Sequence, residues 1–498
     1  MPFQPAMRTH ALLVFLTPLL PFAFGWDPTW ESLDSRPLPK WYDDSKFGIF
    51  IHWGVFSVPS WGNFSGEWFW QQWQGSQAPA YDEFVRSTEK PGFAYADYAR
   101  RFRAELYDPS EWSDLFARSG AQYVVLTGKH HEGYCLWDSK AATPLTWNWN
   151  AMDVGPRRDL VGDLSSAIKK TKSVTTGKAL RWGIYHSLYE WFNPLFLADQ
   201  ANGFNTSLFR DQKTMPELYD LVNQYEPELI WSDGHEVAPD SYWRATEFLA
   251  WYATNSSVAK TAVWNDRWGA GIDCNHGAYY TCMDRYQPGK LVEKKWENAL
   301  TIDPGSWGFR RNVNGLGYLS TEHIIHQLVE TVAFGGNMLL NIGPAADGTI
   351  PAVFWDRLLG IGDWLGINGP AIYSTTTWKV AQNQTDEVYY TFKESAKNTV
   401  FAIVTRWPED DVLVLQAPGP LALQDRTHVT LMGMEQELGR LPWKLTDNGL
   451  AISIPPLSPA KIPCQHAWAF AIGGLSRSVK DGNSANGIRG TPIVPSDK

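Results

Sequence analysis

Three carboxylates occupy positions from which they could do chemistry on a substrate. Asp233 lies two residues beyond the apolar run 229–231 and precedes a glycine, Asp266 follows the apolar run 262–264, and Glu297 lies between Trp and Asn. In retaining glycosidases one carboxylate attacks the sugar carbon, while a second protonates the departing oxygen and then activates water. We therefore take Asp233 as the candidate nucleophile, and Asp266 and Glu297 as the two candidates for the acid/base.

Each of these carboxylates also has a plainer interpretation. An Asp-Gly pair is typical of a turn or a helix cap, Asp266 could simply pair with Arg267, and Glu297 could be an exposed helical residue. Trp231 weighs against the turn, because it lies two residues before Asp233 on the same side of the predicted strand. From there its ring can form one wall of a sugar pocket.

Six histidines lie in or near the predicted loops: His52, His130, His131, His186, His235 and His276. Successive side chains of an extended backbone point to opposite faces, so we expect one of His130 and His131 to face a pocket and the other to stand behind it. No His-x-His or His-Glu-x-x-His spacing occurs. We therefore expect no metal or other cofactor, and we interpret the histidines as donors to sugar hydroxyls. For His186 and His276, a buried structural role is the alternative.

Aromatic residues are abundant, with 27 Trp, 20 Tyr and 24 Phe. A Trp ring offers a flat apolar face and one N–H donor, which suits the C–H face of a sugar. Glu67 lies inside the aromatic segment 66–70, where it could accept hydrogen bonds from adjacent hydroxyls while Trp68 packs against the ring. A loop anchored by aromatic side chains is the alternative interpretation.

The elements that would position these side chains alternate between strands and helices from about residue 40 to 365. Capping patterns at Asp108–Glu111 and Thr214–Glu217 predict helix starts. Short apolar runs typical of strands buried on both faces lie at 47–51, 123–126, 182–185, 229–231, 262–264 and 338–342. Polar residues follow nearly every run, and in a barrel those strand ends meet at one mouth. A doubly wound sheet usually carries a GxGxxG turn, which is missing here, so we predict a TIM-like (β/α) barrel.

The pattern changes after about residue 370. Short strand-like runs at 388–392, 400–404, 412–415, 429–431 and 467–470 follow one another without helices, which indicates an antiparallel β-sandwich. The predicted divisions are therefore a signal peptide at 1–25, the barrel at 26–368, the sandwich at 369–475 and a polar, disordered tail at 476–498.

The first 25 residues have the features of an export signal. Arg8 and His10 precede an apolar run, and small residues at 23 and 25 predict cleavage before Trp26. Two prolines and the shortness of the run argue against a spanning helix, so we expect no membrane insertion. Four glycosylation sequons agree with export to the lysosome or the cell exterior: Asn63, Asn205, Asn255 and Asn383.

Charge and cysteine content bound the partners and the cross-links. The net charge of −10 and the absence of a basic stripe exclude nucleic acid as an expected partner. Cys274 and Cys282 flank a short loop and are predicted to form a disulfide, whereas Cys135 and Cys464 could pair or remain free thiols. We also expect a homo-oligomer, with the number of subunits left open.

Several blocks of this sequence closely resemble the metazoan α-L-fucosidases of glycoside hydrolase family 29 over about residues 27–475. The most specific blocks are 50–59 (FIHWGVFSVP), 129–133 (KHHEG), 185–188 (YHSL), 229–234 (LIWSDG), 265–269 (NDRWG) and 336–344 (GNMLLNIGP). The resemblance implies a barrel with a C-terminal sandwich, retention of configuration, no metal and fucosylated glycans as partners. A metal-dependent barrel hydrolase and a non-catalytic fucose-binding protein are the two alternatives.

The resemblance also assigns roles to individual residues. It implies that Asp233, within the Trp-Ser-Asp motif, is the nucleophile, and both Asp266 and Glu297 match motifs proposed for the acid/base. The residues implied for the sugar pocket are His52, Glu67, Trp68, His130, His131, Tyr185, Trp231, Arg267 and Trp307. One departure is the sequon Asn63-Phe-Ser65, interposed between a Trp-Gly pair and Glu67, which bears on where Glu67 is placed.

Overall fold

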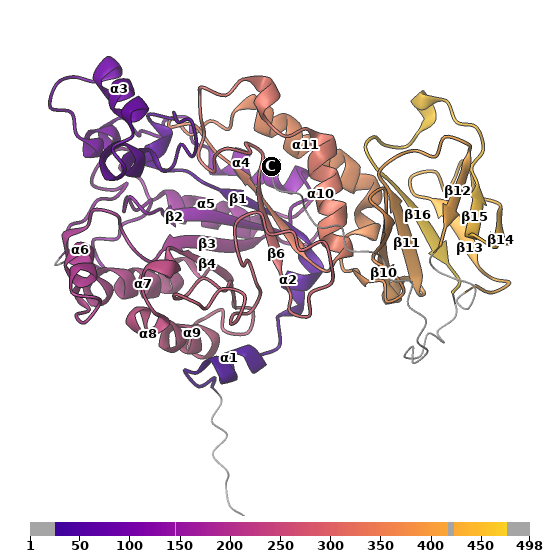
Figure 1. The fold of residues 1–498 in the computed structure, drawn as a ribbon, viewed down its shortest axis with the longest axis horizontal. Coiled ribbons are helices and arrows are strands. Elements are labelled where there is room, and N and C mark those ends of the chain that lie inside the picture. The colour runs from indigo at the N-terminus through magenta and orange to yellow at the C-terminus, as the bar shows by residue number, and fades with distance from the viewer. Residues whose placement is uncertain (1–24, 145, 417–422, 476–498) are drawn as a thin grey trace, which may run out of the picture.

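The computed structural model describes residues 25–144, 146–416 and 423–475, and Figure 1 shows a mixed helix and strand part joined to a smaller part made of strands. Apart from Gly25, the predicted signal peptide lies outside the described residues, as does the predicted tail at 476–498. Within the described residues, no helix has the length and apolar character needed to cross a membrane.

The first part is built on one parallel sheet in the order β5-β4-β3-β2-β1-β7-β6. Its strands are β1 (Phe47–Ile51), β2 (Tyr123–Lys129), β3 (Arg181–Ser187), β4 (Leu229–Asp233), β5 (Val263–Trp264), β6 (Glu297–Thr301) and β7 (Asn337–Ile342). The predicted barrel is confirmed, but it is an open one. β5 and β6 stand at the two ends of the described sheet with no pairing between them, and the helix-free stretch from Asn265 to Trp296 spans the gap.

The sequence prediction missed β6. Its residues, Glu-Asn-Ala-Leu-Thr, are mostly polar, yet all five are buried. The interpretation of Glu297 as an exposed helical residue is therefore wrong, since its side chain lies inside the sheet with none of its surface exposed. Burial of a carboxylate requires partners, and Glu297 has three of them among side chains of the barrel interior.

Helices lie around the sheet, and several of them cover its outer side (Figure 1). They are α1 (Trp30–Ser35), α2 (Lys40–Ser45), α3 (Pro79–Thr88), α4 (Pro109–Arg118), α5 (Leu160–Lys170), α6 (Pro194–Ala201), α7 (Met215–Tyr225), α8 (Asp240–Trp243), α9 (Ala245–Thr254), α10 (Thr321–Ala333) and α11 (Ala352–Asn368). Asp108 caps α4 as predicted, because its carboxylate accepts the N–H groups of Ser110 and Glu111. The predicted cap at Thr214 is wrong, since a π-helical turn runs directly into α7 and the Thr214 hydroxyl instead donates to the carbonyl of Leu188.

The second part is the predicted β-sandwich. One sheet contains β8 (Thr376–Thr377), β9 (Asn383–Thr385), β10 (Val388–Lys393), β11 (Thr399–Val404), β13 (His428–Leu431) and β16 (Trp468–Gly473); the other contains β12 (Val412–Leu415), β14 (Trp443–Thr446) and β15 (Gly449–Ser453). Apolar residues from both sheets share one core. The sandwich packs on the α10–α11 side of the barrel (Figure 1), where the Trp364 indole donates to the Ala467 carbonyl.

The inside of the barrel is aromatic. Tyr42, Phe50, Tyr123, Tyr185, Trp231, Tyr279 and Trp307 form one buried cluster with the inward residues of the strands. A separate, larger cluster fills the space between the strands and the helices. The interior rings therefore form the bottom of any pocket at the carboxyl ends of the strands.

Candidate active site

A cavity of about 360 Å³ opens at the carboxyl ends of β1 to β4. Its lining combines aromatic rings with titratable groups: Phe50, His52, Trp68, His130, His131, Tyr185, Trp231, Asp233, His235, Glu236, Arg267, Asp273, Cys282, Met283, Asp284 and Trp307. This size suits a small ligand, and the mixture of rings and polar groups suits one that has both apolar and hydroxyl-bearing faces. The expected convergence of strand ends on one pocket is thus present.

Asp233 ends β4 and stands in the wall of this cavity, with 19% of its side chain exposed. The Tyr185 hydroxyl donates to Oδ2 at 2.8 Å, and the Arg267 guanidinium donates to Oδ1 at 3.0 Å. Burial alone would raise the pKa of Asp233, but the charge of Arg267 and the contact with His131 outweigh it and hold that pKa well below its usual range. Asp233 is therefore an ionised, oriented carboxylate, as a nucleophile must be.

Arg267 joins three polar groups of the pocket. Besides Asp233, its guanidinium binds Asp284 at 2.7 Å and the Thr281 hydroxyl at 3.1 Å. It also lies 4.6 Å from the centre of the Trp231 ring, a cation–π arrangement. The guanidinium is almost fully buried, so its position is set by these partners and not by solvent.

The expectation that His130 and His131 face opposite ways is wrong, because both line the cavity, with ring centres 4.3 Å apart. A shift in the pairing register of β2 and β3 at Gly128 interrupts the alternation. Lys129 is consequently turned outward, and the two histidines that follow are already beyond the strand. Burial and the neighbouring His130 lower the pKa of His131, so a neutral ring is favoured at ordinary pH.

His52 and Trp307 form another part of the pocket wall. The His52 ring bonds to the side-chain oxygen of Asn341 at 2.7 Å and lies 5.0 Å from the Trp307 ring. Burial lowers the pKa of His52 well below its usual value, and the neighbouring His130 ring acts in the same direction. His52 is thus a neutral ring, and no hydrogen bond to its Nε2 is formed by the described residues.

Glu67 lies just behind this wall and is completely buried. Its Oε2 accepts hydrogen bonds from the Ser306 hydroxyl and from the backbone N–H groups of Trp307 and Gly308, at 2.8 to 3.1 Å. Its Oε1 has no hydrogen-bond partner among the described residues. A buried carboxylate oxygen without a donor is costly, which is the signature of an atom kept for a ligand or water.

The structure places neither predicted acid/base on the cavity wall. Glu297 lies in the barrel interior, where Tyr42, Tyr123 and Trp231 donate to its carboxylate at 2.7, 2.8 and 3.0 Å. Asp266 is also fully buried, and its oxygens accept only from its own neighbouring loop. Both carboxylates have the surroundings of structural groups.

Three other carboxylates line the cavity and were missed by sequence reasoning: Glu236, Asp273 and Asp284. His235 lies 3.4 Å from Glu236 and 3.5 Å from Asp273, whereas Asp284 shares Arg267 with Asp233. No strand directly precedes Asp273 or Asp284, so the rule that catalytic groups follow strands does not find them. The same rule could have found Glu236, because this residue lies three positions after the end of β4.

A buried ion network adjoins the pocket on the outer face of β2 and β3. It consists of Lys129, Glu190, Lys213 and Glu217, together with His186. Glu217 is its centre, accepting from Lys129 at 2.7 Å, His186 at 2.9 Å and Lys213 at 3.0 Å. Burial lowers the pKa of His186 to about 4, so its ring is neutral. All members are closed to solvent, and His186 is a structural residue as its alternative interpretation proposed.

Metal-binding geometry is limited in the described part of the chain. The group there that brings at least three potential ligand atoms together is Asp266, Cys274 and Cys282, and its two sulfurs are joined in the predicted disulfide. Cys135 and Cys464 are both free thiols. His276 lies away from the cavity, bound to Asp34 at 2.7 Å.

A barrel whose strand ends gather an ionised carboxylate, further carboxyl groups and aromatic rings into one pocket defines a glycoside hydrolase. The family model described as alpha-L-fucosidase matches residues 23–370, and that described as alpha-L-fucosidase C-terminal domain matches 381–473. The chain therefore belongs to the α-L-fucosidase family, and the resemblance noted from its sequence is confirmed.

Individual relatives agree with this assignment. Tissue α-L-fucosidase of Bos taurus is 49% identical over 452 residues, covering 90% of this chain and 92% of the relative. Plasma α-L-fucosidase of Homo sapiens is 50% identical, covering 90% and 93%. The structure of Thermotoga maritima α-fucosidase in complex with a mechanism-based inhibitor has a TM-score of 0.74 at 32% identity, covering 90% of this chain and all of that one.

Proposed function

We propose that this α-L-fucosidase removes terminal fucose from glycoprotein and glycolipid glycans by double displacement, with Asp233 as the nucleophile. The observation that carries the proposal is the setting of Asp233, which is ionised, aimed into the cavity and fixed by Tyr185 and Arg267. Its free electron pair can attack the anomeric carbon while the bond to the leaving oxygen breaks. Water then cleaves the resulting ester, which restores the carboxylate and releases fucose with its original configuration.

Asp284 is the acid/base that the geometry favours. Asp233 and Asp284 each bind a terminal nitrogen of the same guanidinium, at 3.0 and 2.7 Å, so the two carboxyl groups lie close together across the pocket. Retaining enzymes hold their two carboxyl groups about 5–5.5 Å apart. The Asp284 side chain is 44% exposed, which leaves access for a leaving group and for the incoming water. Asp266 and Glu297 lack such access.

The remaining residues suit the fucose ring itself. L-Fucose carries a methyl group in place of a hydroxymethyl, and the Trp68, Trp231 and Trp307 rings offer apolar walls for it. Its three free hydroxyls need donors and acceptors, which neutral His52 and His131 and the unpartnered Oε1 of Glu67 can provide.

The nucleophile is tested with Asp233→Ala on an aryl α-L-fucoside. We expect a loss of turnover on the order of 10⁴-fold, with partial recovery on addition of azide, which enters the vacated space and leaves as a fucosyl azide. A fluorinated fucoside that traps the intermediate should label Asp233 in the wild type. A label on another residue would overturn the assignment.

The acid/base is tested by comparing leaving groups. Asp284→Ala should slow a poor leaving group far more than an activated aryl group, because only the former needs a proton in the transition state. Glu236→Gln and Asp273→Asn are matched controls from the same cavity. Asp266→Asn and Glu297→Gln complete the set, and the leaving-group effect appearing in either of them instead would reinstate that residue.

We also propose that the protein is exported, glycosylated and delivered to the lysosome or the cell exterior. The features in support are the apolar leader at the N-terminus and the four sequons. Mass spectrometry of the protein from a eukaryotic host should show a mature N-terminus at Trp26 and glycans on the sequon asparagines. Retention of the leader would contradict the proposal.

A further inference from the structure

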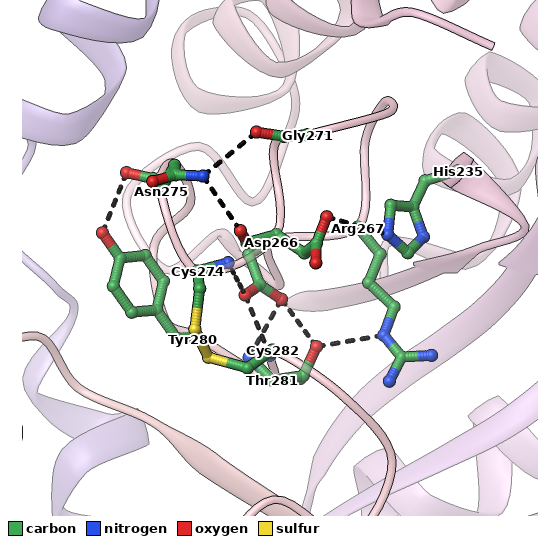
Figure 2. Close-up of a disulfide and its surroundings, with 10 residues drawn as sticks. His235, Asp266, Arg267, Gly271, Cys274, Asn275, Tyr280, Thr281 and Cys282 are labelled. Carbon is green, nitrogen blue, oxygen red and sulfur yellow. Dashed lines mark hydrogen bonds and ion pairs between the residues drawn. A yellow bond between two sulfur atoms is a disulfide. The ribbon is translucent and has the colours of Figure 1, made fainter. Parts of the chain in front are cut away.

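Asp266 is the centre of a loop that forms one wall of the pocket. Its Oδ1 accepts the backbone N–H and the hydroxyl of Thr281, at 2.9 and 2.6 Å. Its Oδ2 accepts the N–H groups of Cys274 and Cys282, at 2.8 and 3.0 Å. Figure 2 shows the carboxylate enclosed by these residues, with the disulfide beside it. Four donors on one buried carboxylate fix the path of the chain on both sides of the loop.

Thr281 connects this centre to the reacting groups. Its hydroxyl donates to Asp266, and the same oxygen accepts Nε–H of Arg267 at 3.1 Å. The two terminal nitrogens of Arg267 then reach Asp233 and Asp284. The guanidinium is planar, so a bond at Nε sets the plane in which the other two nitrogens point. Asp266 therefore acts on the pocket through Thr281 and Arg267, without touching it.

The Cys274–Cys282 disulfide closes the loop, and other contacts hold it from outside. His276 bonds to Asp34 at 2.7 Å, and its ring stacks on Trp30 of α1. Gly277, at φ +148°, lies so close to Asp266 that an added Cβ would come within 3.1 Å of it. Cys274 itself is exposed, so that a reductant in solution can reach the disulfide.

We propose that Asp266, Thr281 and the Cys274–Cys282 disulfide form a positioning clamp for Arg267, and that reductive opening of this disulfide lowers fucosidase activity. The inference rests on the proposed role of Asp233, because Arg267 matters through that carboxylate. Opening requires a dithiol: the S–S bond breaks, each sulfur gains one electron and one proton, and the dithiol is oxidised to a cyclic disulfide. The segment that carries Met283 and Asp284 then loses its covalent link to Cys274 and is held by non-covalent contacts only.

The link through Thr281 is tested with Thr281→Val, which preserves shape but removes the hydroxyl. Loss of one such bond corresponds to about a tenfold fall in kcat/KM, with the acid limb of the pH profile moving to higher pH as Arg267 drifts from Asp233. Thr281→Ser should restore both. The matched control is Thr391→Val in the sandwich, whose buried hydroxyl donates to the Ala371 carbonyl. An unchanged pH profile in Thr281→Val would overturn the clamp.

The disulfide is tested by treating the wild type with a dithiol in the presence of EDTA, which prevents the freed thiolates and Asp266 from gathering a metal. We expect kcat/KM to fall several-fold and to recover on reoxidation. A Cys274→Ser/Cys282→Ser double variant should have the lower activity from the start and should ignore the dithiol. Full activity of the reduced enzyme and of the double variant would overturn the proposal. Trapping of a fucosyl ester on Asp233 is scored separately, so that failure of the clamp and failure of the nucleophile assignment remain distinct.

Discussion

Two clusters of charged side chains lie near the ends of β2, β3 and β4, and they differ in their access to solvent. In the pocket, Asp233, Arg267 and Asp284 face a cavity, and their side chains are 19%, 8% and 44% exposed. In the buried ion network, the ammonium groups of Lys129 and Lys213 meet the carboxylates of Glu190 and Glu217, and nothing reaches solvent.

The difference shows how this fold separates charged groups that stabilise the structure from charged groups that face the pocket. Two positive and two negative charges in the network satisfy one another, and all four groups are buried. In the pocket, the rings and carboxylates contact protein on one side and face the cavity on the other. The bulge at Gly128 creates this division, since it sends Lys129 to the network and leaves His130 and His131 to the pocket.

The largest effect should come from breaking the network. Glu217→Gln removes the negative charge shared by two buried ammonium groups, and breaking such a pair costs about 3–5 kcal/mol of unfolding free energy. Urea denaturation measures this loss, whereas KM for an aryl fucoside at low temperature should change little. Glu247→Gln, on an exposed pair with Arg244, is the control and should stay within about 0.5 kcal/mol. A stable Glu217→Gln variant with poor kcat would mean that the network belongs to the chemistry.

An intermediate effect is expected in the pocket. Arg267→Met removes the cation that lowers the pKa of Asp233, so that this pKa rises and a larger fraction of Asp233 is protonated in acid. The acid limb of kcat/KM should move upward by about one to three pH units, together with a lower plateau. The pH profile of Arg244→Met should match the wild type. An acid limb that stays in place in Arg267→Met would show that Arg267 does not set the charge of Asp233.

The smallest effect concerns His186. Its pKa is about 4 in the folded protein and near 6.5 when unfolded, so the unfolded chain binds the extra proton between these values. Stability should therefore fall as pH drops from about 6.5 toward 4, by at most about 1.4 kcal/mol per pH unit. His186→Asn should flatten that dependence in urea titrations at pH 4.5 and 7 while leaving the pH profile of kcat/KM unchanged. A slope equal to that of the wild type would assign the titration elsewhere.

The sequence was sufficient for the strands that are apolar on both faces and for the residues that follow them. Asp233, His52 and the two histidines after β2 were found because barrel strand ends converge. β6 could not be found, since Glu297 and Asn298 are polar, and the burial of Glu297 depends on Tyr42 and Tyr123, which lie far away in the chain. Asp284 escaped for a related reason, because a carboxylate within a loop carries no periodic signal.

Asp266 illustrates the opposite situation. It follows a strand, as a catalytic carboxylate would, yet its oxygens are consumed by four donors from its own loop. The position of a residue after a strand predicts where its backbone lies in the barrel. The partners of its side chain depend on how the residues that follow it fold.

The open seam between β5 and β6 has a consequence for redesign. A helix normally links consecutive strands of a barrel, but here the chain from Asn265 to Trp296 crosses the gap as loop and supplies Asp273, Met283 and Asp284 to the pocket. Exchanging residues 286–292 alters the flank beyond Asp284 and leaves the residues of every strand in place. Libraries that vary the entrance to the pocket therefore belong in this seam, because they leave the strands and Asp233 unchanged.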